Sequence, residues 1–466
     1  MAGVLLIAPI LLAACGNSSA FVDGVPRGLH TWPSIVLFRV SCPKPGQCVA
    51  VGDRQSGSTH QAIVVEQRGG IWSKPIPVSP PLNALGDPLE LLSCTGGGNC
   101  IAIGGGGPLL LVARNHGRWS GNHVLSVVKA PAALKGQATA CSPSGPCWSL
   151  AFASAAHPVS FAIGETAGRW LPAVRLGDTA SRIRGRRPWA FASDISCFSA
   201  TSCTVAGEMQ SVSKTQAEHP FVQTEVGGQW GPPQSTPSAT STGPGVSFQL
   251  FALIGNPGAL SCTSKGTCLL GGYEQRQAAY VGAVEQEANG RWKPPVSGIG
   301  VAAPSLQSQV YQVSCHSALF CAASGVSELP GNRTALFVQM EVDGRWRRPA
   351  FIPTGITWGS FNDVIPKVTI CSTASTCDVV GEIVTTDHRY LSFEATYAGS
   401  RWHHSVISLG GQHDQTAITG MSCDVIRCWG VGTISKKNGS TVAFDFTQVS
   451  SANLSGSTLA IPAAAQ

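Results

Sequence analysis

Cysteine is the residue type in this sequence whose spacing most clearly indicates chemistry. Sixteen of the seventeen cysteines fall into eight close pairs, seven of them six residues apart and the last five apart. Five intervening residues can place two Cβ atoms opposite each other across an antiparallel strand pair, within disulfide range. The pairs are Cys42/Cys48, Cys94/Cys100, Cys141/Cys147, Cys197/Cys203, Cys262/Cys268, Cys315/Cys321, Cys371/Cys377 and Cys423/Cys428.

Zinc binding is the competing chemistry for paired cysteines. Structural zinc sites usually place their cysteines about two to four residues apart and need four ligands that converge. The pairs here are wider, and successive pairs begin 47 to 65 residues apart. The spacing therefore predicts eight local disulfides and no metal site. Disulfides in turn indicate an oxidising compartment outside the cytoplasm.

Motifs for other catalytic chemistry are missing from the sequence. It contains no Gly-x-Ser-x-Gly, no His-Glu-x-x-His and no paired carboxylates in a glycosidase-like context. The glycine run at 104–107 follows an apolar stretch and is interpreted as a turn. His403 and His404 adjoin Trp402 and are interpreted as a surface strand pair. We therefore expect no cofactor.

Two long connections hold the best candidates for ligand binding. One packs four arginines into six residues beside a tryptophan, and guanidinium groups next to an aromatic ring suit carboxylate, sulfate or sugar ligands. The other, "GITWGSFNDV", combines aromatic and amide side chains. A solvated basic loop is the alternative for the first, and core packing for the second. The candidates are Arg182, Arg184, Arg186, Arg187, Trp189, Trp358 and Asn362.

The cysteine pairs belong to a longer repeat. Six of the eight first cysteines follow a serine, and the fourth residue after the second cysteine is glycine in seven repeats, with Ala151 in the third. An alternating stretch such as "QAIVVEQ" follows, which is typical of a β-strand. Seven repeats then place a glycine shortly before a tryptophan. These tryptophans are Trp72, Trp119, Trp170, Trp230, Trp292, Trp346 and Trp402.

The period of the repeat matches one four-stranded blade of a β-propeller. We expect strand A to end at the first cysteine, strand B to start at the second, strand C to be the alternating stretch and strand D to start at the tryptophan, which packs between blades. The sequence thus predicts an all-β, eight-bladed β-propeller with one disulfide per blade, and a seven-bladed ring is the alternative. The eighth repeat lacks Gly-x-Trp, so either "STLAIPA" or the N-terminal "GLHTW", with Trp32, supplies its outer strand.

The overall composition agrees with many short strands joined by turns. The chain of 466 residues has 54 glycines and 31 prolines, and only 12% of its residues are charged. No long segment shows helical periodicity. A net charge of +6 is modest for this length and is far from the signature of a nucleic-acid-binding protein. We expect a monomer that does not bind nucleic acid.

The seventeenth cysteine, Cys15, follows the apolar segment 1–14, which ends in Leu-Ala-Ala. This segment resembles a bacterial lipoprotein signal peptide with its lipobox, although no basic residue precedes the apolar run. The resemblance implies cleavage before Cys15 and lipid on its sulfur, so the protein would be anchored to the cell membrane from outside. A plain signal peptide with an incidental cysteine is the alternative. The expected organisation is a signal peptide at 1–14, an N-terminal tether at 15–33 and the propeller at 34–466.

The repeat also carries a family resemblance. Ser-Cys-x5-Cys-x3-Gly followed by Gly-x-Trp resembles a group of secreted bacterial repeat proteins over residues 34–450. More distantly, "EVDGRW" and "QRGGIW" resemble a decayed BNR/Asp-box, the Ser-x-Asp-x-Gly-x-x-Trp hairpin of sialidase-type propellers. That resemblance implies the propeller fold, but most copies lack the Ser and Asp of the motif.

The functional prediction is a non-catalytic module or scaffold that binds cell-envelope glycan or protein. The alternative is a sialidase-like glycoside hydrolase or lyase with a degenerate site. Such an enzyme would need a tyrosine and a carboxylate as a nucleophile pair. The chain has five tyrosines, and no glutamate is evidently paired with one of them in the sequence.

Overall fold

The structure is a computed structural model, and within its described residues every regular element is a β-strand. These residues are 21–22, 25–26, 31–78, 82–83, 88–104, 109–120, 123–124, 134–143, 145–153, 158–177, 190–210, 218–237, 246–249, 259–276, 279–303, 306–357, 365–384, 390–398, 401–407, 414–423 and 427–449. No helix in this part of the chain has the length and apolar character needed to cross a bilayer.

Three long antiparallel strands form the repeating unit, and eight such units follow one another in the described residues. The first strands, A, are β4 (Ile35–Lys44), β10 (Leu89–Cys94), β15 (Leu134–Cys141), β20 (Ala190–Ser199), β26 (Leu260–Ser264), β31 (Ser308–Ser317), β36 (Ile365–Thr373) and β40 (Gln415–Cys423). The second strands, B, are β5 (Gln47–Ser56), β11 (Cys100–Gly104), β16 (Cys147–Ala153), β21 (Ser202–Gln210), β27 (Thr267–Arg276), β32 (Phe320–Leu329), β37 (Thr376–Val384) and β41 (Arg427–Ser435). The third strands, C, are β6 (Thr59–Arg68), β12 (Leu110–Asn115), β17 (Val159–Thr166), β22 (Glu218–Val226), β28 (Ala279–Ala288), β33 (Arg333–Val342), β38 (Tyr390–Ala398) and β42 (Thr441–Val449).

A fourth strand, D, pairs with strand C at the outer edge and is broken into short pieces in most units. The pieces are β7 (Ile71–Trp72), β8 (Ile76–Pro77), β9 (Leu82–Asn83), β13 (Arg118–Trp119), β14 (His123–Val124), β18 (Arg169–Trp170), β19 (Val174–Arg175), β23 (Gln229–Trp230), β24 (Gln234–Ser235), β29 (Arg291–Trp292), β30 (Val296–Ser297), β34 (Arg345–Trp346), β35 (Ala350–Thr357) and β39 (Arg401–Ile407). Outside this scheme, β1 (Phe21–Val22) pairs with β2 (Val25–Pro26), and β25 (Val246–Gln249) pairs with β27.

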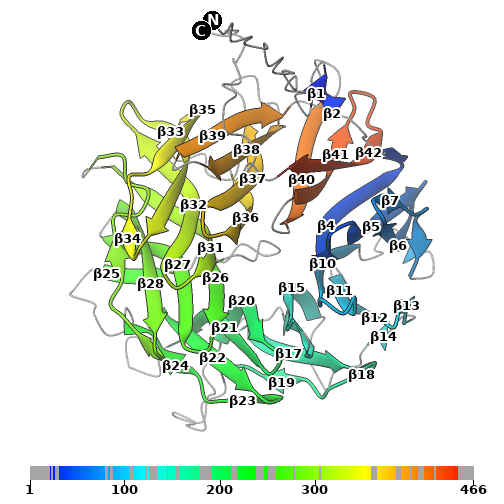
Figure 1. The fold of residues 1–466 in the computed structure, drawn as a ribbon, viewed down its shortest axis with the longest axis horizontal. Helices are drawn as coiled ribbons and strands as arrows, with labels where there is room; N and C mark the ends of the chain where they lie inside the picture. Colours follow the sequence, from blue (N-terminus) through cyan, green and yellow to red (C-terminus); the bar gives the residue numbers. More distant parts are fainter. Residues whose placement is uncertain are drawn as a thin grey trace, which may run out of the picture.

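The N-terminal strand β3 (Thr31–Pro33) closes the ring. It pairs antiparallel with β42, the last strand of the described residues, and Trp32 lies opposite Ala443. The sequence offers two alternatives for the outer strand of the last unit. The N-terminal segment with Trp32 is observed in that position. The other alternative, "STLAIPA", lies outside the described residues. Figure 1 shows the units arranged around a common centre, with the blue first unit beside the orange and red last unit.

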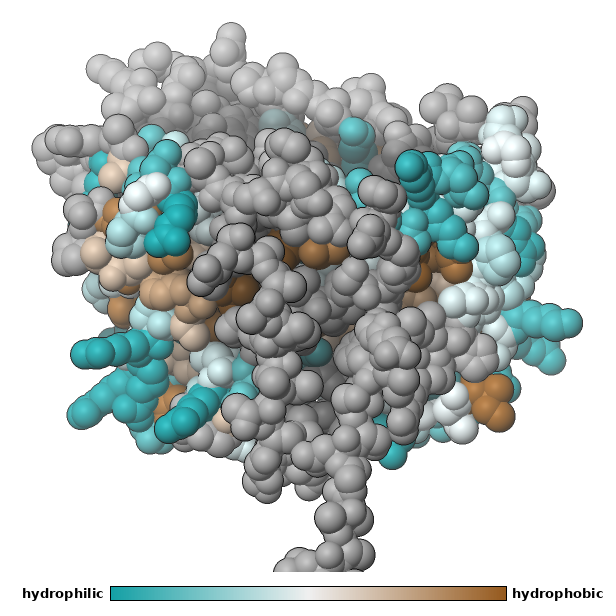
Figure 2. Space-filling model, turned by 90° about the horizontal axis from the view of Figure 1, so that it is seen from above, coloured by the Kyte–Doolittle hydropathy of each residue, from teal (hydrophilic) through white to brown (hydrophobic). Residues whose placement is uncertain are grey.

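The chain is thus an all-β propeller, as the repeat predicted. The sheets are separate except that the third and fourth units join through one parallel bridge, Val159 to Ala190. The number of blades stays a prediction. In Figure 2, a side view of the ring, hydrophobic residues lie in a band at mid-height and hydrophilic side chains lie toward the two faces.

All eight cysteine pairs form disulfides across the turn between strands A and B, with Cα atoms 3.9 to 4.1 Å apart. Seven of the pairs are direct cross-strand partners in the register, such as Cys94 and Cys100. Cys42 and Cys48 are the exception, because the register shifts between Ser41 and Lys44. The predicted local pairing and the predicted strand order are both present.

The strand boundaries at the disulfides differ from the prediction. Strand B starts at the second cysteine only in β11 and β16, and in the other six units it starts one residue earlier. Strand A runs two residues past the first cysteine in five units. The ladder continues beyond the disulfide because the connecting turn is tight, as the pairing of Ser199 with Ser202 shows. The second cysteines that lie inside strand B are Cys48, Cys203, Cys268, Cys321, Cys377 and Cys428.

The second cysteine of each unit is also a core residue, which the spacing of the cysteines did not predict. Strand B is an inner strand of the sheet, so its side chains are covered by the neighbouring units. The first cysteines are more exposed, as the intermediate burial of Cys197 shows. The second cysteines, all at most 2% exposed, are Cys48, Cys100, Cys147, Cys203, Cys268, Cys321, Cys377 and Cys428.

The glycine four residues after the second cysteine lets strand A lie close to strand B. A Cβ atom at Gly52 would lie 1.9 Å from the carbonyl oxygen of Val36, so any side chain there would displace strand A. The third unit has Ala151 at this position, and its register partner on strand A is Gly136. A Cβ atom at Gly136 would lie 3.0 Å from the Ile103 side chain of the second unit, so this glycine makes room for the neighbouring unit.

The tryptophans of the Gly-x-Trp turns pack between neighbouring units, as predicted. Trp119 contacts buried residues of the first and second units, and Trp230 contacts those of the third and fourth. At the closing seam, Trp32 and Trp72 meet edge to face with ring centroids 6.1 Å apart. Large aromatic surfaces therefore fill the wedge-shaped space between units.

The serine before the first cysteine has a role that the repeat did not reveal. Its hydroxyl oxygen accepts the backbone N–H of the first cysteine of a neighbouring unit, at 2.9 to 3.0 Å. Each bond satisfies a backbone donor near the end of strand A. The pairs are Ser93 with Cys141, Ser196 with Cys262, Ser261 with Cys315, Ser314 with Cys371, and Ser422 with Cys42.

Candidate functional site

The seven candidate ligand residues lie outside the described residues and stay a prediction. Arg182, Arg184, Arg186, Arg187 and Trp189 belong to the connection between β19 and β20. Trp358 and Asn362 belong to the connection between β35 and β36, and Cys15 lies near the N-terminus. β20 and β36 are the A strands of the fourth and seventh units. Each begins at the end that lies far from the disulfide of its unit. The two connections therefore reach the ring at the face opposite the disulfide-linked turns.

The sixteen paired cysteines are structural and cannot act as ligands or nucleophiles. Each is bonded to its predicted partner, so no thiolate is available. Cys48, Cys203 and Cys377 also pack in three different core clusters of the ring. The disulfides therefore link strands within the core as well as at the surface turns, and they do not mark a binding site.

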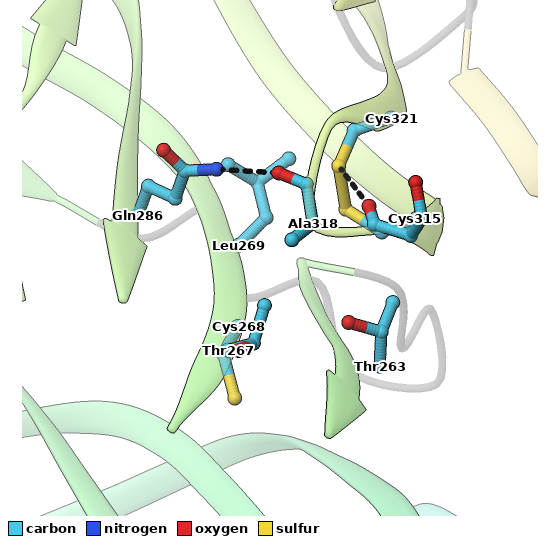
Figure 3. A pocket seen from close by; sticks show the side chains of 9 residues that line it. Thr263, Thr267, Cys268, Leu269, Gln286, Cys315, Ala318 and Cys321 are labelled. Atoms are coloured by element: carbon cyan, nitrogen blue, oxygen red, sulfur yellow. Dashed lines mark hydrogen bonds between the residues drawn. A yellow bond between two sulfur atoms is a disulfide. The ribbon is translucent and has the colours of Figure 1, made fainter. Parts of the chain in front are cut away.

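Figure 3 shows a depression between the fifth and sixth units, beside two disulfide turns. Gln286 spans it and donates a hydrogen bond of 3.0 Å to the carbonyl oxygen of Ala318. The depression is too small to hold a water molecule. It is a seam between two units rather than a substrate pocket. Its lining residues are Thr263, Thr267, Cys268, Leu269, Gln286, Cys315, Ser317, Ala318 and Cys321.

A group of tyrosines comes closest to the nucleophile pair of a sialidase-like enzyme. Tyr273 and Tyr280 pack edge to face with centroids 5.2 Å apart. Burial first, and then the charge of Glu208, raise the pKa of Tyr273 to about 12. Burial also raises the pKa of Tyr311, the bulge residue of β31. The phenols of Tyr273 and Tyr311 stay protonated at neutral pH, whereas a tyrosine nucleophile needs a lowered pKa.

A buried carboxylate joins the first two units. Glu66 accepts hydrogen bonds from Arg114 Nε and from Trp119 Nε1, each at 2.9 Å. Burial alone would raise its pKa, but the hydrogen bond from Arg68 and the charge of Arg114 keep the pKa of Glu66 below its usual value. The carboxylate is therefore ionised and held by three donors, so its role is to fix the seam.

The closing seam uses the same arrangement. Trp72 Nε1 donates to Asp445 Oδ2 at 2.7 Å, and both side chains are buried. In each case the tryptophan of one unit donates to a carboxylate on strand C of the preceding unit. The sequence could not reveal these partners, because they lie in different repeats.

Two buried carboxylates lie where the seventh unit meets the eighth. Burial raises the pKa of Asp378 to about 6. Burial and then the Asp378 carboxylate raise the pKa of Glu394 to about 8. Asp378 lies close to the sulfurs of Cys423 and Cys428, a grouping with the spacing of a metal site. Those sulfurs are bonded to each other, so neither is available as a thiolate ligand.

An exposed arginine precedes the tryptophan in five of the seven Gly-x-Trp turns. Each one lies opposite the last residue of strand C, so all five occupy one register position of the ring. The signal is visible in the sequence as the recurring tripeptide Gly-Arg-Trp, or Ser-Arg-Trp in the seventh repeat. The five are Arg118, Arg169, Arg291, Arg345 and Arg401, which we call the turn arginines.

Comparison with known proteins does not assign the chain to a family. No family model matches the chain, and no curated protein matches it. Solved structures that resemble it include the β-propeller domain of the Trilobed protease from Pyrococcus furiosus, with 8% identity, 80% of this chain and 98% of that chain covered, and a TM-score of 0.44. The Dos1 propeller has 11% identity, coverage of 89% and 93%, and a TM-score of 0.48. Trypanosoma rangeli sialidase in complex with the inhibitor DANA has 11% identity, coverage of 66% and 54%, and a TM-score of 0.39. The fold assignment rests on the ring of sheets itself.

Proposed function

We propose that this propeller is a non-catalytic binding or scaffold module that works outside the cytoplasm, attached to the membrane by lipid on Cys15. The observation that carries the proposal is the set of eight disulfides, one at each A–B turn. A reducing compartment would leave these thiols free. The lipid anchor rests on the lipobox-like sequence before Cys15.

The chemistry of the described residues supports a binding role over catalysis. The carboxylates of Glu66 and Asp445 are held by donors of a neighbouring unit. Tyr273 has a raised pKa, which does not suit a nucleophile. These groups stabilise the ring and do not line a cleft. A rigid ring with long connections on one face suits recognition of a glycan or a protein.

The proposed ligand-binding element is the connection that contains Arg182, Arg184, Arg186, Arg187 and Trp189. Four positive charges within six residues repel one another, and a bound anion would relieve that repulsion. The test is a binding screen with sulfated, sialylated and wall-derived glycans, using wild type and a variant with all four arginines changed to serine. We expect the variant to lose binding to an anionic glycan.

Equal binding by the two proteins would remove this connection from consideration. Cleavage of any glycan by wild type would contradict the non-catalytic role and favour the glycosidase alternative. Because the connection is a segment between two strands, the substitutions should leave the melting temperature unchanged, and this is the check that the variant is folded.

A further inference from the structure

The turn arginines lie on a face where exposed positive charge predominates. The A–B turns and the C–D turns, which end at the tryptophans, share one face of the ring, here called the turn face. Lys44 and Lys265 are exposed at A–B turns of the same face. Among the described residues of these turns, Asp343 is the only exposed carboxylate. The described part of the turn face is therefore positively charged.

The turn arginines are available to an external partner. Within the described residues, none of the five forms a hydrogen bond or an ion pair through its side chain. Glu165, four residues before Arg169, is buried, and its Oε1 accepts the backbone N–H of Gly168 at 2.5 Å. Asp343, two residues before Arg345, is exposed and offsets part of the positive charge in that one turn. Five exposed guanidinium groups at equivalent positions around a ring can all meet one extended anionic surface.

Apolar side chains are exposed on the same face as these cations. Ile71 takes the place of the arginine in the first Gly-x-Trp turn and is 73% exposed. Leu319, at the A–B turn of the sixth unit, is 56% exposed, and Val226, at the end of strand C in the fourth unit, is 48% exposed. Exposed apolar tips among cations are typical of surfaces that enter the interface of a bilayer.

The chain enters the ring from the same side. Strand β3 runs antiparallel to β42, which ends at the turn face, so the start of β3 points toward that face. Cys15 lies sixteen positions before Thr31, and the β1–β2 hairpin takes up six of them, so the reach is at most about 40 Å. A tether of this length holds the protein near a membrane without orienting it, so orientation needs a second contact.

We propose that the turn face binds the surface of a bilayer rich in anionic phospholipids, with the turn arginines on headgroup phosphates. This deepens the proposed function, since it rests on membrane attachment and adds the orientation. The connection that holds Arg182 would then point away from the membrane toward its ligand. The lipid on Cys15 holds the protein at the membrane, and a basic surface adds the orientation that the lipid alone does not fix.

The test measures partition of the full chain, with Cys15→Ser so that no acyl chain contributes. The vesicles are phosphatidylcholine with or without an equal amount of phosphatidylglycerol. Each arginine near an anionic surface adds about fivefold to affinity. The variant Arg169→Gln/Arg291→Gln/Arg345→Gln should lose about 100-fold in partition to the anionic vesicles and nothing in partition to neutral vesicles. Molar salt should abolish the wild-type preference for anionic vesicles.

The matched control is Arg333→Gln/Lys436→Gln/Lys437→Gln, which removes the same charge from exposed B–C connections on the opposite face. It should lose less than about threefold, since those charges lie more than a Debye length from the membrane. Equal losses in the two variants, or no wild-type preference for anionic vesicles, would overturn the proposal. Arginine-dependent binding to soluble polyphosphate without vesicle binding would also overturn it. The glycan screen with the 182–187 variant does not depend on any of these vesicle or polyphosphate measurements, so the proposed glycan binding and the proposed membrane binding can fail separately.

Discussion

The hydroxyl oxygen of Ser422 lies 2.9 Å from the backbone nitrogen of Cys42, although the two residues are 380 positions apart in the sequence. This bond joins the last unit to the first and repeats the bond seen between neighbouring units elsewhere in the ring. The serine of the Ser-Cys motif is therefore an element of ring closure rather than of the hairpin that contains it.

Replacing Ser422 with alanine should lower the free energy of unfolding by about 1–2 kcal/mol, because the partly buried N–H of Cys42 loses its acceptor. Denaturant titration of the oxidised protein measures this. The control is Ser58→Ala, at an exposed turn position, which should change stability by less than about 0.5 kcal/mol. A Ser422 variant as stable as the control would show that the bond does not contribute to closure.

The Trp72→Phe variant should be destabilised by about 1–3 kcal/mol, because phenylalanine keeps most of the packing but leaves buried Asp445 without the indole donor. Trp292→Phe is the matched control, since no hydrogen bond from that indole is present in the described residues. If the two variants lose the same stability, packing and not the bond to Asp445 accounts for the role of Trp72. Thermal and denaturant unfolding measure both.

Buried Glu394 predicts a specific dependence of stability on pH. Its pKa is about 8 in the folded protein, above the ordinary value of a glutamate, so folding favours its protonated form. Its contribution to stability is full below the unfolded pKa, falls as the pH rises, and is lost above about pH 8. Wild type should therefore lose stability between about pH 5 and pH 9 relative to Glu394→Gln, which cannot ionise.

The measurement for Glu394 is the free energy of unfolding of both proteins across this pH range. The glutamine variant should be as stable as wild type near the acidic end and more stable near the alkaline end. The control is Asp343→Asn, at an exposed turn position, which should stay within about 0.5 kcal/mol of wild type at every pH. A constant difference between wild type and Glu394→Gln would contradict the assignment.

Changing Cys15 to alanine should release the protein from membranes, because several acyl chains give stable anchoring and their attachment needs the thiol. Fractionation of cells that express wild type or the variant measures this, with a molar-salt wash that removes protein held only by the charges of the turn face. Anchoring by an uncleaved apolar segment would instead leave the variant in the membrane fraction. That outcome would contradict lipidation of Cys15 while leaving the propeller fold unaffected.

Much of the fold could be predicted because its signals are local. The cysteine pairs span six residues, and the alternating stretch before each tryptophan lies within one hairpin, so both are visible along the chain. The role of Ser422 could not be predicted, since its partner Cys42 is brought close only by closing the ring. The close approach of Gly136 to Ile103 of the second unit is likewise visible only once the units are packed together.

The burial of the second cysteines shows the same limit. The spacing of Cys203 and Cys377 from their partners predicts a bond but not its depth in the ring. Their sulfurs are covered by neighbouring units, as the contact of the Cys203 sulfur with the Ser142 hydroxyl of the third unit shows. Packing between repeats therefore buries the second cysteine of each pair more deeply than the first.

The candidate site was harder to predict because its contacts also join different repeats. Whether Glu66 is a free acid or a seam residue depends on Arg114 and Trp119 of the next unit. The connection with Arg182 was predicted from charge density alone, and it stays a prediction. The turn arginines are evident in the sequence as a tripeptide, but their common face follows only from the position of each one opposite the end of strand C.

The most direct test of a disulfide-linked extracytoplasmic propeller is peptide mapping of the protein from its native source, without reduction. Each cysteine should be found linked to its neighbour six residues away, or five for Cys423 and Cys428, giving eight local pairs. Links between different repeats would contradict the ring of hairpins, and free thiols in most pairs would contradict the oxidising compartment.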